Sequence, residues 1–192
     1  MNNFWARIHR LAFRVKLRIL GSNHEKKNKI LRQLFWHIGE NAAICTDHYG
    51  NEPYLIWIGN NVIVATGVQF VNHDASCWNM YRYLGVDYCK LDEKVGPIVL
   101  KDNCFIGARA ILLPNVVVGK NSVVAAGAVV NKSIPDNEVW GGVPARFIMT
   151  VDEYANKNKQ YYENVRLLNI NDKNIKDQRK KLYKNYIEHL DS

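Results

Sequence analysis

The sequence predicts an all-β solenoid with helical extensions at both ends, and a six-residue repeat is the main reason. From Leu100 to Ile134 an aliphatic residue opens each unit, and a mostly small residue stands in its fifth place. A period of six fits neither an α-helix nor a long pleated strand, but it suits short strands that turn a corner every six residues. The opening residues are Leu100, Ile106, Leu112, Val118, Val124 and Val130, and the fifth residues are Cys104, Ala110, Val116, Ser122, Ala128 and Ile134.

Each opening residue is expected to point into the solenoid, where burying a Val, Ile or Leu side chain contributes roughly 1.5 to 3 kcal/mol. Each fifth residue is expected inside a corner, where little room remains. Glycines and asparagines fall between these anchors, where the backbone bends and a positive φ is often needed. They are Gly107, Gly119 and Gly127, with Asn103, Asn115 and Asn121.

The repeat also occurs earlier in the chain, in a weaker form. One coil has Ile58, Val64 and Phe70 as opening residues, with Val62 and Val68 in the fifth place. Ile38 and Ile44, with Ala42 at a corner, start a further coil that residues 49–54 interrupt. Residues 75–97 break the period and are rich in aromatic side chains, so this insertion is expected to be functional rather than disordered.

These patterns divide the chain into three regions. Residues 1–37 are predicted to form a basic amphipathic helical segment, residues 38–149 the solenoid domain with its inserted loop 75–97, and residues 150–192 a helical tail. In the first segment apolar residues follow helical spacing while arginines occupy another face. That apolar stripe packs either on the solenoid or a neighbouring subunit, or residues 1–20 bind an anionic membrane surface. The stripe consists of Phe4, Trp5, Ile8, Leu11, Ala12, Val15 and Ile19.

Composition narrows the class of protein. The 192 residues carry a net charge of +8 without any nucleic-acid motif, which indicates solvated basic faces rather than nucleic-acid binding. No stretch is long and apolar enough for a membrane span, and no signal peptide is visible. The four cysteines form no CxxC pair, which favours reduced thiols in a cytoplasm and gives no zinc site.

The chemistry is expected at His73, which ends the first strong coil and directly precedes the irregular insertion. A histidine in that place can act as a general base, removing a proton from a hydroxyl or amine that attacks an activated acyl group. Such a base typically contributes about 10² to 10⁴ in rate. Asn72 or Asp74 is the candidate for orienting the imidazole ring, although Asp74 also stands in a corner register where it can serve the backbone alone.

The combination of hexapeptide units, a single histidine before a loop, Phe105-Ile106-Gly107 and the closing segment 139–146 resembles the left-handed parallel β-helix acyltransferases. The resemblance is to the maltose, galactoside and virginiamycin acetyltransferases and to relatives that O-acetylate bacterial surface polysaccharides. It covers about residues 38 to 149. It implies left-handed coils, a homotrimer, acetyl-CoA as co-substrate without a metal, and a role in polysaccharide biosynthesis.

The resemblance also implies roles for individual residues. His73 matches the catalytic base, with Asp74 where the family usually has a proline. Acetyl-CoA is expected in the cleft between neighbouring subunits, where small residues let its pantetheine arm approach the backbone and two cations meet its phosphates. The matching positions are Phe105, Ala108, Ala126, Gly127, Asn131, Lys132 and Arg146, with Phe105 in place of a tryptophan and Asn131 in place of a threonine.

The acceptor is less determined by the sequence. Aromatic side chains of the insertion are expected to overhang His73 and stack on a sugar, or to pack against a neighbouring subunit. The leading function is O-acetylation of a sugar hydroxyl. N-acetylation of an amino sugar, antibiotic acetylation and a noncatalytic structural β-helix stay as alternatives, whereas a zinc carbonic anhydrase needs more histidines than the repeats contain. The predicted acceptor residues are Trp78, Met80, Tyr81 and Tyr83.

Overall fold

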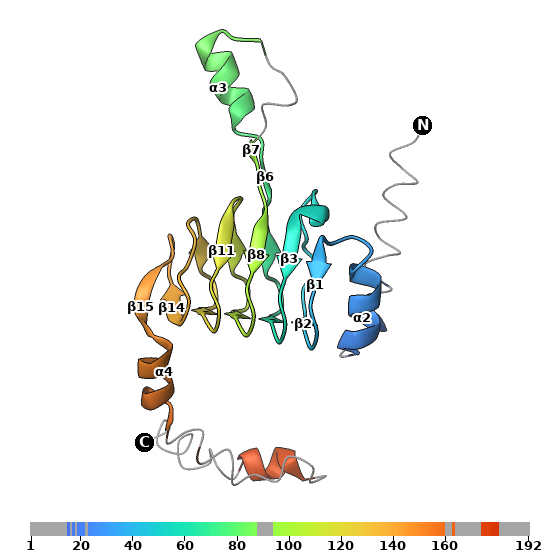
Figure 1. The fold of residues 1–192 in the computed structure, drawn as a ribbon, viewed down its shortest axis with the longest axis vertical. Helices are drawn as coiled ribbons and strands as arrows, with labels where there is room; N and C mark the ends of the chain where they lie inside the picture. The colour runs from blue at the N-terminus through green and yellow to red at the C-terminus, as the bar shows by residue number, and fades with distance from the viewer. Residues whose placement is uncertain are drawn as a thin grey trace. The chain divides into compact units, whose positions relative to one another are not determined.

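A computed structural model of the chain describes residues 15, 17, 19–21, 23–87, 94–159, 163 and 174–180 (Figure 1). The chain divides into two compact units, Met1–Val151 and Asp152–Ser192. The first unit contains every described β-strand. The second holds most of α4 (Val151–Lys157) and a helical stretch over residues 175–180. The helical spacing that predicts a helix in this tail falls outside the described residues, at Leu182, Tyr183, Tyr186, Ile187 and Leu190.

The strands of the first unit form three main sheets in which neighbouring strands are parallel, apart from one closing strand. Sheet A consists of β1 (His37–Ile38), β3 (Ile56–Ile58), β8 (Ile98–Leu100) and β11 (Val116–Val118). Sheet B consists of β2 (Ala43–Ile44), β4 (Ile63–Val64), β9 (Phe105–Ile106), β12 (Val123–Val124) and β14 (Glu138–Gly141), followed by the antiparallel β15 (Arg146–Thr150). Sheet C consists of β5 (Gln69–Phe70), β10 (Ile111–Leu112) and β13 (Val129–Val130).

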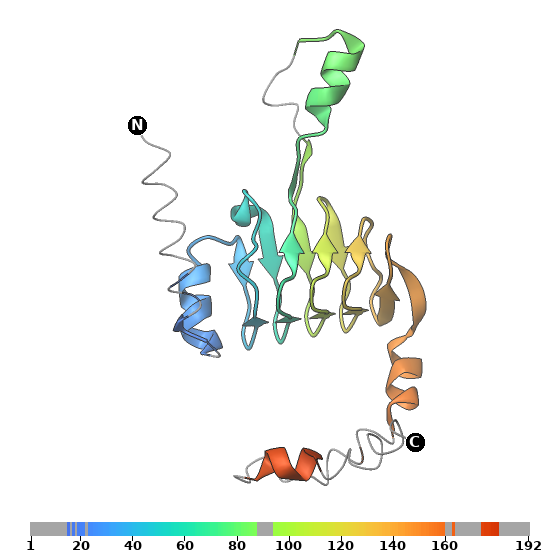
Figure 2. The same ribbon diagram turned by 180° about the vertical axis from the view of Figure 1, so that it is seen from behind.

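The chain visits sheets A, B and C in turn, so each circuit stacks on the one before it (Figures 1 and 2). The register follows the six-residue repeat, because Ile58 pairs with Leu100 and Leu100 with Val118. These opening residues have no solvent exposure, and the fifth residues, such as Ala110, are equally buried. The predicted interior is therefore confirmed. The same holds for the first, interrupted coil, where the side chains of Ile38, Ala42 and Ile44 are buried.

The corners use asparagine and glycine for two different reasons. Asn103, Asn115 and Asn121 have positive φ as predicted, and Gly127 has φ +71°. Gly107 and Gly119 instead lie too close to the next coil for a side chain: a Cβ at Gly107 would be 2.4 Å from the nitrogen of Ala126. Gly107 is thus required for close packing of coils, and its neighbour Gly127 for backbone conformation.

The insertion forms a two-stranded antiparallel stem that carries a helix. Strand β6 (His73–Asp74) pairs with β7 (Lys94–Val95), and α3 (Cys77–Leu84) lies beyond the stem. Figures 1 and 2 both show stem and helix projecting away from the stacked coils. The sequence predicted a break in the repeat here, which is confirmed, but it did not predict the helix.

The first coil has no preceding coil to bond, and the helix α2 (His24–Leu31) covers that end. Polar side chains from the helix and its C-terminal cap reach the coil's backbone carbonyls. The Asn28 Nδ2 donates to Ala42 at 2.7 Å, and the Arg32 Nε donates to Ile38 at 3.0 Å. These bonds supply donors that a further coil would otherwise provide.

Most of the predicted N-terminal stripe lies outside the described residues, but its last members can be placed. Val15 and Ile19 are 46% and 79% exposed, whereas Leu17, which the stripe did not include, is only 1% exposed. Among the described residues no helix is long and apolar enough to cross a membrane. Membrane binding through residues 1–20 and a cytoplasmic location stay predictions.

Candidate active site

His73 stands where the chain leaves the stacked coils. His73 is the first residue of β6 and pairs with Val95 across the stem. The imidazole Nδ1 lies 3.0 Å from the Glu52 Oε1, and the two side chains are 21% and 15% exposed. A carboxylate can only accept, so Nδ1 carries the proton in this bond, and in the neutral ring Nε2 is then the basic nitrogen.

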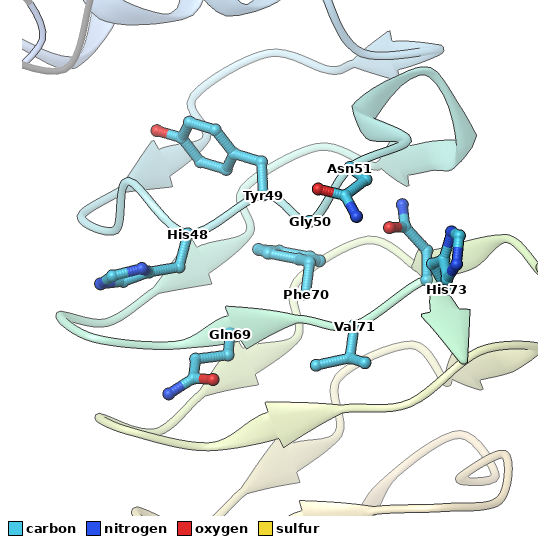
Figure 3. A pocket seen from close by; sticks show the side chains of 9 residues that line it. His48, Tyr49, Gly50, Asn51, Gln69, Phe70, Val71 and His73 are labelled. Atoms are coloured by element: carbon cyan, nitrogen blue, oxygen red, sulfur yellow. The ribbon is translucent and has the colours of Figure 1, made fainter. Parts of the chain in front are cut away.

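A pocket of about 300 Å³ adjoins this histidine. Figure 3 shows His73 at one end of the pocket and His48 and Gln69 at the other. Polar side chains and backbone line much of it, a composition that suits a hydroxyl-rich ligand better than a purely apolar one. The lining residues are His48, Tyr49, Gly50, Asn51, Gln69, Phe70, Val71, Asn72 and His73.

The two residues predicted to orient the ring have other bonds. The Asn72 side chain is fully buried and its Nδ2 donates to the backbone oxygen of Glu52 at 2.5 Å. The Asp74 Oδ1 accepts from the backbone N–H of Ser76 at 2.9 Å, just before α3, and this bond holds the pKa of the Asp74 carboxyl below its usual value. Asn72 therefore acts on Glu52, and Asp74 serves the start of the helix.

The small residues predicted to contact the donor meet at one corner of the coils. The backbone N–H of Gly127 donates to the oxygen of Ala108 at 2.8 Å, and Ala126 follows the same strand as Gly127. Ala108 and Ala126 are exposed, and Phe105 on the adjoining strand is 39% exposed. This corner is therefore open to a ligand along its length.

The remaining donor positions lie elsewhere. Asn131 and Lys132 follow β13 at the next corner, and Lys132 Nζ lies 5.0 Å from the centre of the Trp140 ring. Arg146 opens β15 opposite Gly141, and its side chain is exposed. One chain thus brings the small residues together without gathering all seven predicted positions at one place.

Within one chain, the residues predicted to bind the acceptor do not line the pocket at His73, and their contact with an acceptor stays a prediction. Trp78, Met80, Tyr81 and Tyr83 all lie on α3, which the stem carries away from the coils (Figure 1). None of these four side chains lines the pocket at His73. Tyr83 is 82% exposed and Met80 is 52% exposed. The alternative, contact with a neighbouring subunit, stays a prediction.

The sequence analysis missed Glu52, which the structure places against His73. The two residues are 21 apart in the sequence, and no short motif connects them. A signal was nevertheless present, because Glu52 lies in the segment that interrupts the first coil. Asn51 and Gln69, which line the pocket, were missed as well. Among the described residues, no group of three or more His, Cys, Asp or Glu side chains could hold a metal ion.

Comparison with known proteins agrees with this architecture. Residues 97–132 match the family described as bacterial transferase hexapeptide (six repeats). The chain is 40% identical to Protein CapG of Staphylococcus aureus over 148 residues, which are 76% of this chain and 83% of that protein. It is 30% identical to the galactoside O-acetyltransferase of Escherichia coli K12 over 161 residues, 73% of this chain and 75% of that protein.

A solved structure shows the same fold. The galactoside acetyltransferase in complex with coenzyme A superposes with a TM-score of 0.53 at 24% identity, over 77% of this chain and 82% of that one. Fold and relatives together define an acyltransferase, which removes the noncatalytic alternative. The chain belongs to the bacterial transferase hexapeptide family.

Proposed function

We propose that this chain is an acetyl-CoA-dependent O-acetyltransferase that acetylates a hydroxyl of a sugar or of a surface-polysaccharide precursor, with His73 as the general base. The observation that supports it most is the sheltered His73 imidazole at the edge of a pocket, bonded to Glu52 at 3.0 Å. The relative named galactoside O-acetyltransferase supports the hydroxyl acceptor.

The reaction needs one proton acceptor and no covalent acyl-enzyme. The basic Nε2 of His73 takes the hydroxyl proton while the hydroxyl oxygen attacks the thioester carbonyl carbon. The carbon–sulfur bond then breaks, and the imidazolium returns the proton to the leaving thiolate of coenzyme A. Because the second imidazole nitrogen, Nδ1, is bonded to Glu52, the ring presents Nε2 to the reaction in a fixed orientation.

The donor is proposed to lie along the corner of Ala108, Ala126 and Gly127, where small side chains expose the backbone. Coenzyme A is the ligand of the galactoside acetyltransferase that shares this fold. Within one chain this corner follows sheet B strands, whereas His73 follows a sheet C strand. A cleft between subunits of a homotrimer with left-handed coils brings a donor corner of one subunit to His73 of another.

The acceptor is proposed to enter the pocket beside His73. Asn51 and Gln69 offer amide groups to sugar hydroxyls there, and the volume of about 300 Å³ has room for a single sugar ring. If α3 packs on a neighbouring subunit, its exposed Trp78 and Tyr83 add flat apolar surfaces for further rings. N-acetylation of an amino sugar uses the same base and geometry, so only the acceptor distinguishes it.

The experiment is transfer from acetyl-CoA to a panel of sugars and amino sugars, followed by release of the free thiol. His73→Ala is expected to lower kcat by about 10² to 10⁴ without changing binding of acetyl-CoA. The matched control is His37→Ala, which removes an exposed histidine that stacks on Trp57 and does not line the pocket. Equal activity in the native chain and His73→Ala contradicts the proposal.

The products decide between the two acceptor classes. An ester product is cleaved by mild alkaline hydroxylamine, whereas an amide product is stable to it. Ester products from neutral sugars support O-acetylation. Amide products from amino sugars alone, with loss in His73→Ala, keep the general base but replace the proposed acceptor.

A further inference from the structure

We propose that Glu52 is the positioning residue of the reaction: its carboxylate holds the Nδ1–H of His73 and stabilises the imidazolium that forms when Nε2 takes the acceptor's proton. This inference rests on the proposed function for its role in catalysis. Nothing in the spacing of the sequence pairs these residues, and the comparisons assign no role to Glu52. The pairing follows from the fold alone, because residues 49–54 interrupt the first coil beside the exit of the second.

The bond joins two sheltered groups. The Nδ1 to Oε1 distance of 3.0 Å lies in the range of a strong charge-assisted hydrogen bond once the ring is protonated. The side chains are only 15% and 21% exposed, so solvent screens the pair less than a surface ion pair. Glu52 therefore favours the tautomer with the proton on Nδ1 and, during the reaction, the charged ring.

The position of Glu52 is fixed independently of His73. The buried Asn72 side chain donates from Nδ2 to the backbone oxygen of Glu52 at 2.5 Å. The loop before Glu52 also approaches Asn72 closely, because a Cβ at Gly50 would meet the Asn72 Oδ1 and Gly50 has φ +72°. A carboxylate held by its own backbone is already placed before substrate binds, as electrostatic preorganisation requires.

The second carboxylate oxygen gives a further reason. The Glu52 Oε2 is buried and has no hydrogen-bond partner among the described residues. A buried carboxylate with few donors gains most from a positive charge beside it. The His73 imidazolium supplies that charge during proton transfer. Glu52 itself keeps its charge throughout, since the proton passes from the acceptor hydroxyl to Nε2 and then to the thiolate of coenzyme A.

The test compares Glu52→Gln with Glu40→Gln, a matched change at an exposed glutamate outside the site. Glu52→Gln keeps the size of the side chain but loses its charge. We expect kcat to fall about 10- to 100-fold with little change in the KM for acetyl-CoA, because only proton transfer is affected. The acid limb of the pH–rate profile should move to lower pH, because the imidazolium loses its carboxylate. Glu52→Asp should retain more activity than Glu52→Gln.

A measurement without any substrate separates this inference from the proposed function. In protein labelled with ¹⁵N-histidine, NMR should show the proton of His73 on Nδ1 in the native chain and a shift toward Nε2 in Glu52→Gln. That result supports the pairing even if no acetyl transfer is found. An unchanged tautomer together with unchanged kcat and pH profile in Glu52→Gln overturns it, even if His73→Ala is inactive. A spectrum of Glu52→Gln with the same dispersion of signals as the native chain excludes unfolding as the cause of any change.

Discussion

Two corners of the coils differ in length, and the difference shows where this repeat tolerates change. The corner between sheets B and C keeps one length in three successive coils, residues 65–68, 107–110 and 125–128. The corner between sheets C and A spans residues 71–97 in one coil and only 113–115 in the next. The uniform corner provides the small residues predicted to meet the donor. The variable corner provides His73, the stem and α3.

The physical reason lies in how tightly each corner packs on its neighbours. At the uniform corner Gly107 has no room for a Cβ against the next coil, so an added residue would break the stacking of strands. At the variable corner the chain leaves through β6 and returns through β7, whose ends pair with each other. The coils above and below stay in register, so residues are added here without disturbing the stack.

The largest effect is expected from Gly107→Ala compared with Gly127→Ala. The Gly107 Cβ would lie 2.4 Å from the nitrogen of Ala126, so the coils must separate at a cost of about 3 kcal/mol or more. Gly127 has open space around it and φ +71°. Gly127→Ala therefore lowers the free energy of unfolding only by the strain of an alanine in the left-handed conformation, about 1 to 2 kcal/mol. Urea unfolding at one fixed protein concentration measures both. Equal losses would show that the uniform corner is not limited by packing.

A smaller effect is expected at the third corner, between sheets A and B, where asparagine amides bond from coil to coil. Asn121 accepts from Asn103 at 3.2 Å and donates to Asn137 at 2.7 Å. Asn121→Ala should cost about 2 kcal/mol, because it loses these bonds and keeps a positive φ. Asn121→Gly should cost about 1 kcal/mol, because glycine adopts that φ freely. A lower Tm for Asn121→Gly than for Asn121→Ala would contradict this explanation.

The smallest effect concerns the cations predicted to meet the donor's phosphates. Lys132→Met and Arg146→Met should each raise the KM for acetyl-CoA about two- to fivefold, as expected for exposed charge pairs, with kcat nearly constant. Lys120→Met is the control, since its partner is Asp102 at another corner. The increase should shrink at high salt because screening weakens the native contact. If all three variants have the same KM, the donor does not use these two residues.

The sequence predicted the interior well because burial imposes the repeat on every coil. Cys104 shows how complete that constraint is: it is 1% exposed, and burial raises the pKa of its thiol to about 12. The parts that could not be predicted depend on contacts between distant segments. Glu52 meets His73 only because two interrupted coils are neighbours, and Trp78 and Tyr83 leave the pocket because β6 and β7 form a straight stem.

The capping helix α2 affects whether molecules of this protein associate end to end. Strands inside a stack of parallel coils are paired on both sides, whereas the strands of the terminal coil each have one unpaired edge, so an uncovered end is a template for the end of another molecule. Asn28 and Arg32 occupy the carbonyls that such a molecule would use. A chain without α2 is therefore expected to pair end to end with a second copy, whereas the antiparallel β15 still covers sheet B at the far end of the stack and opposes longer growth.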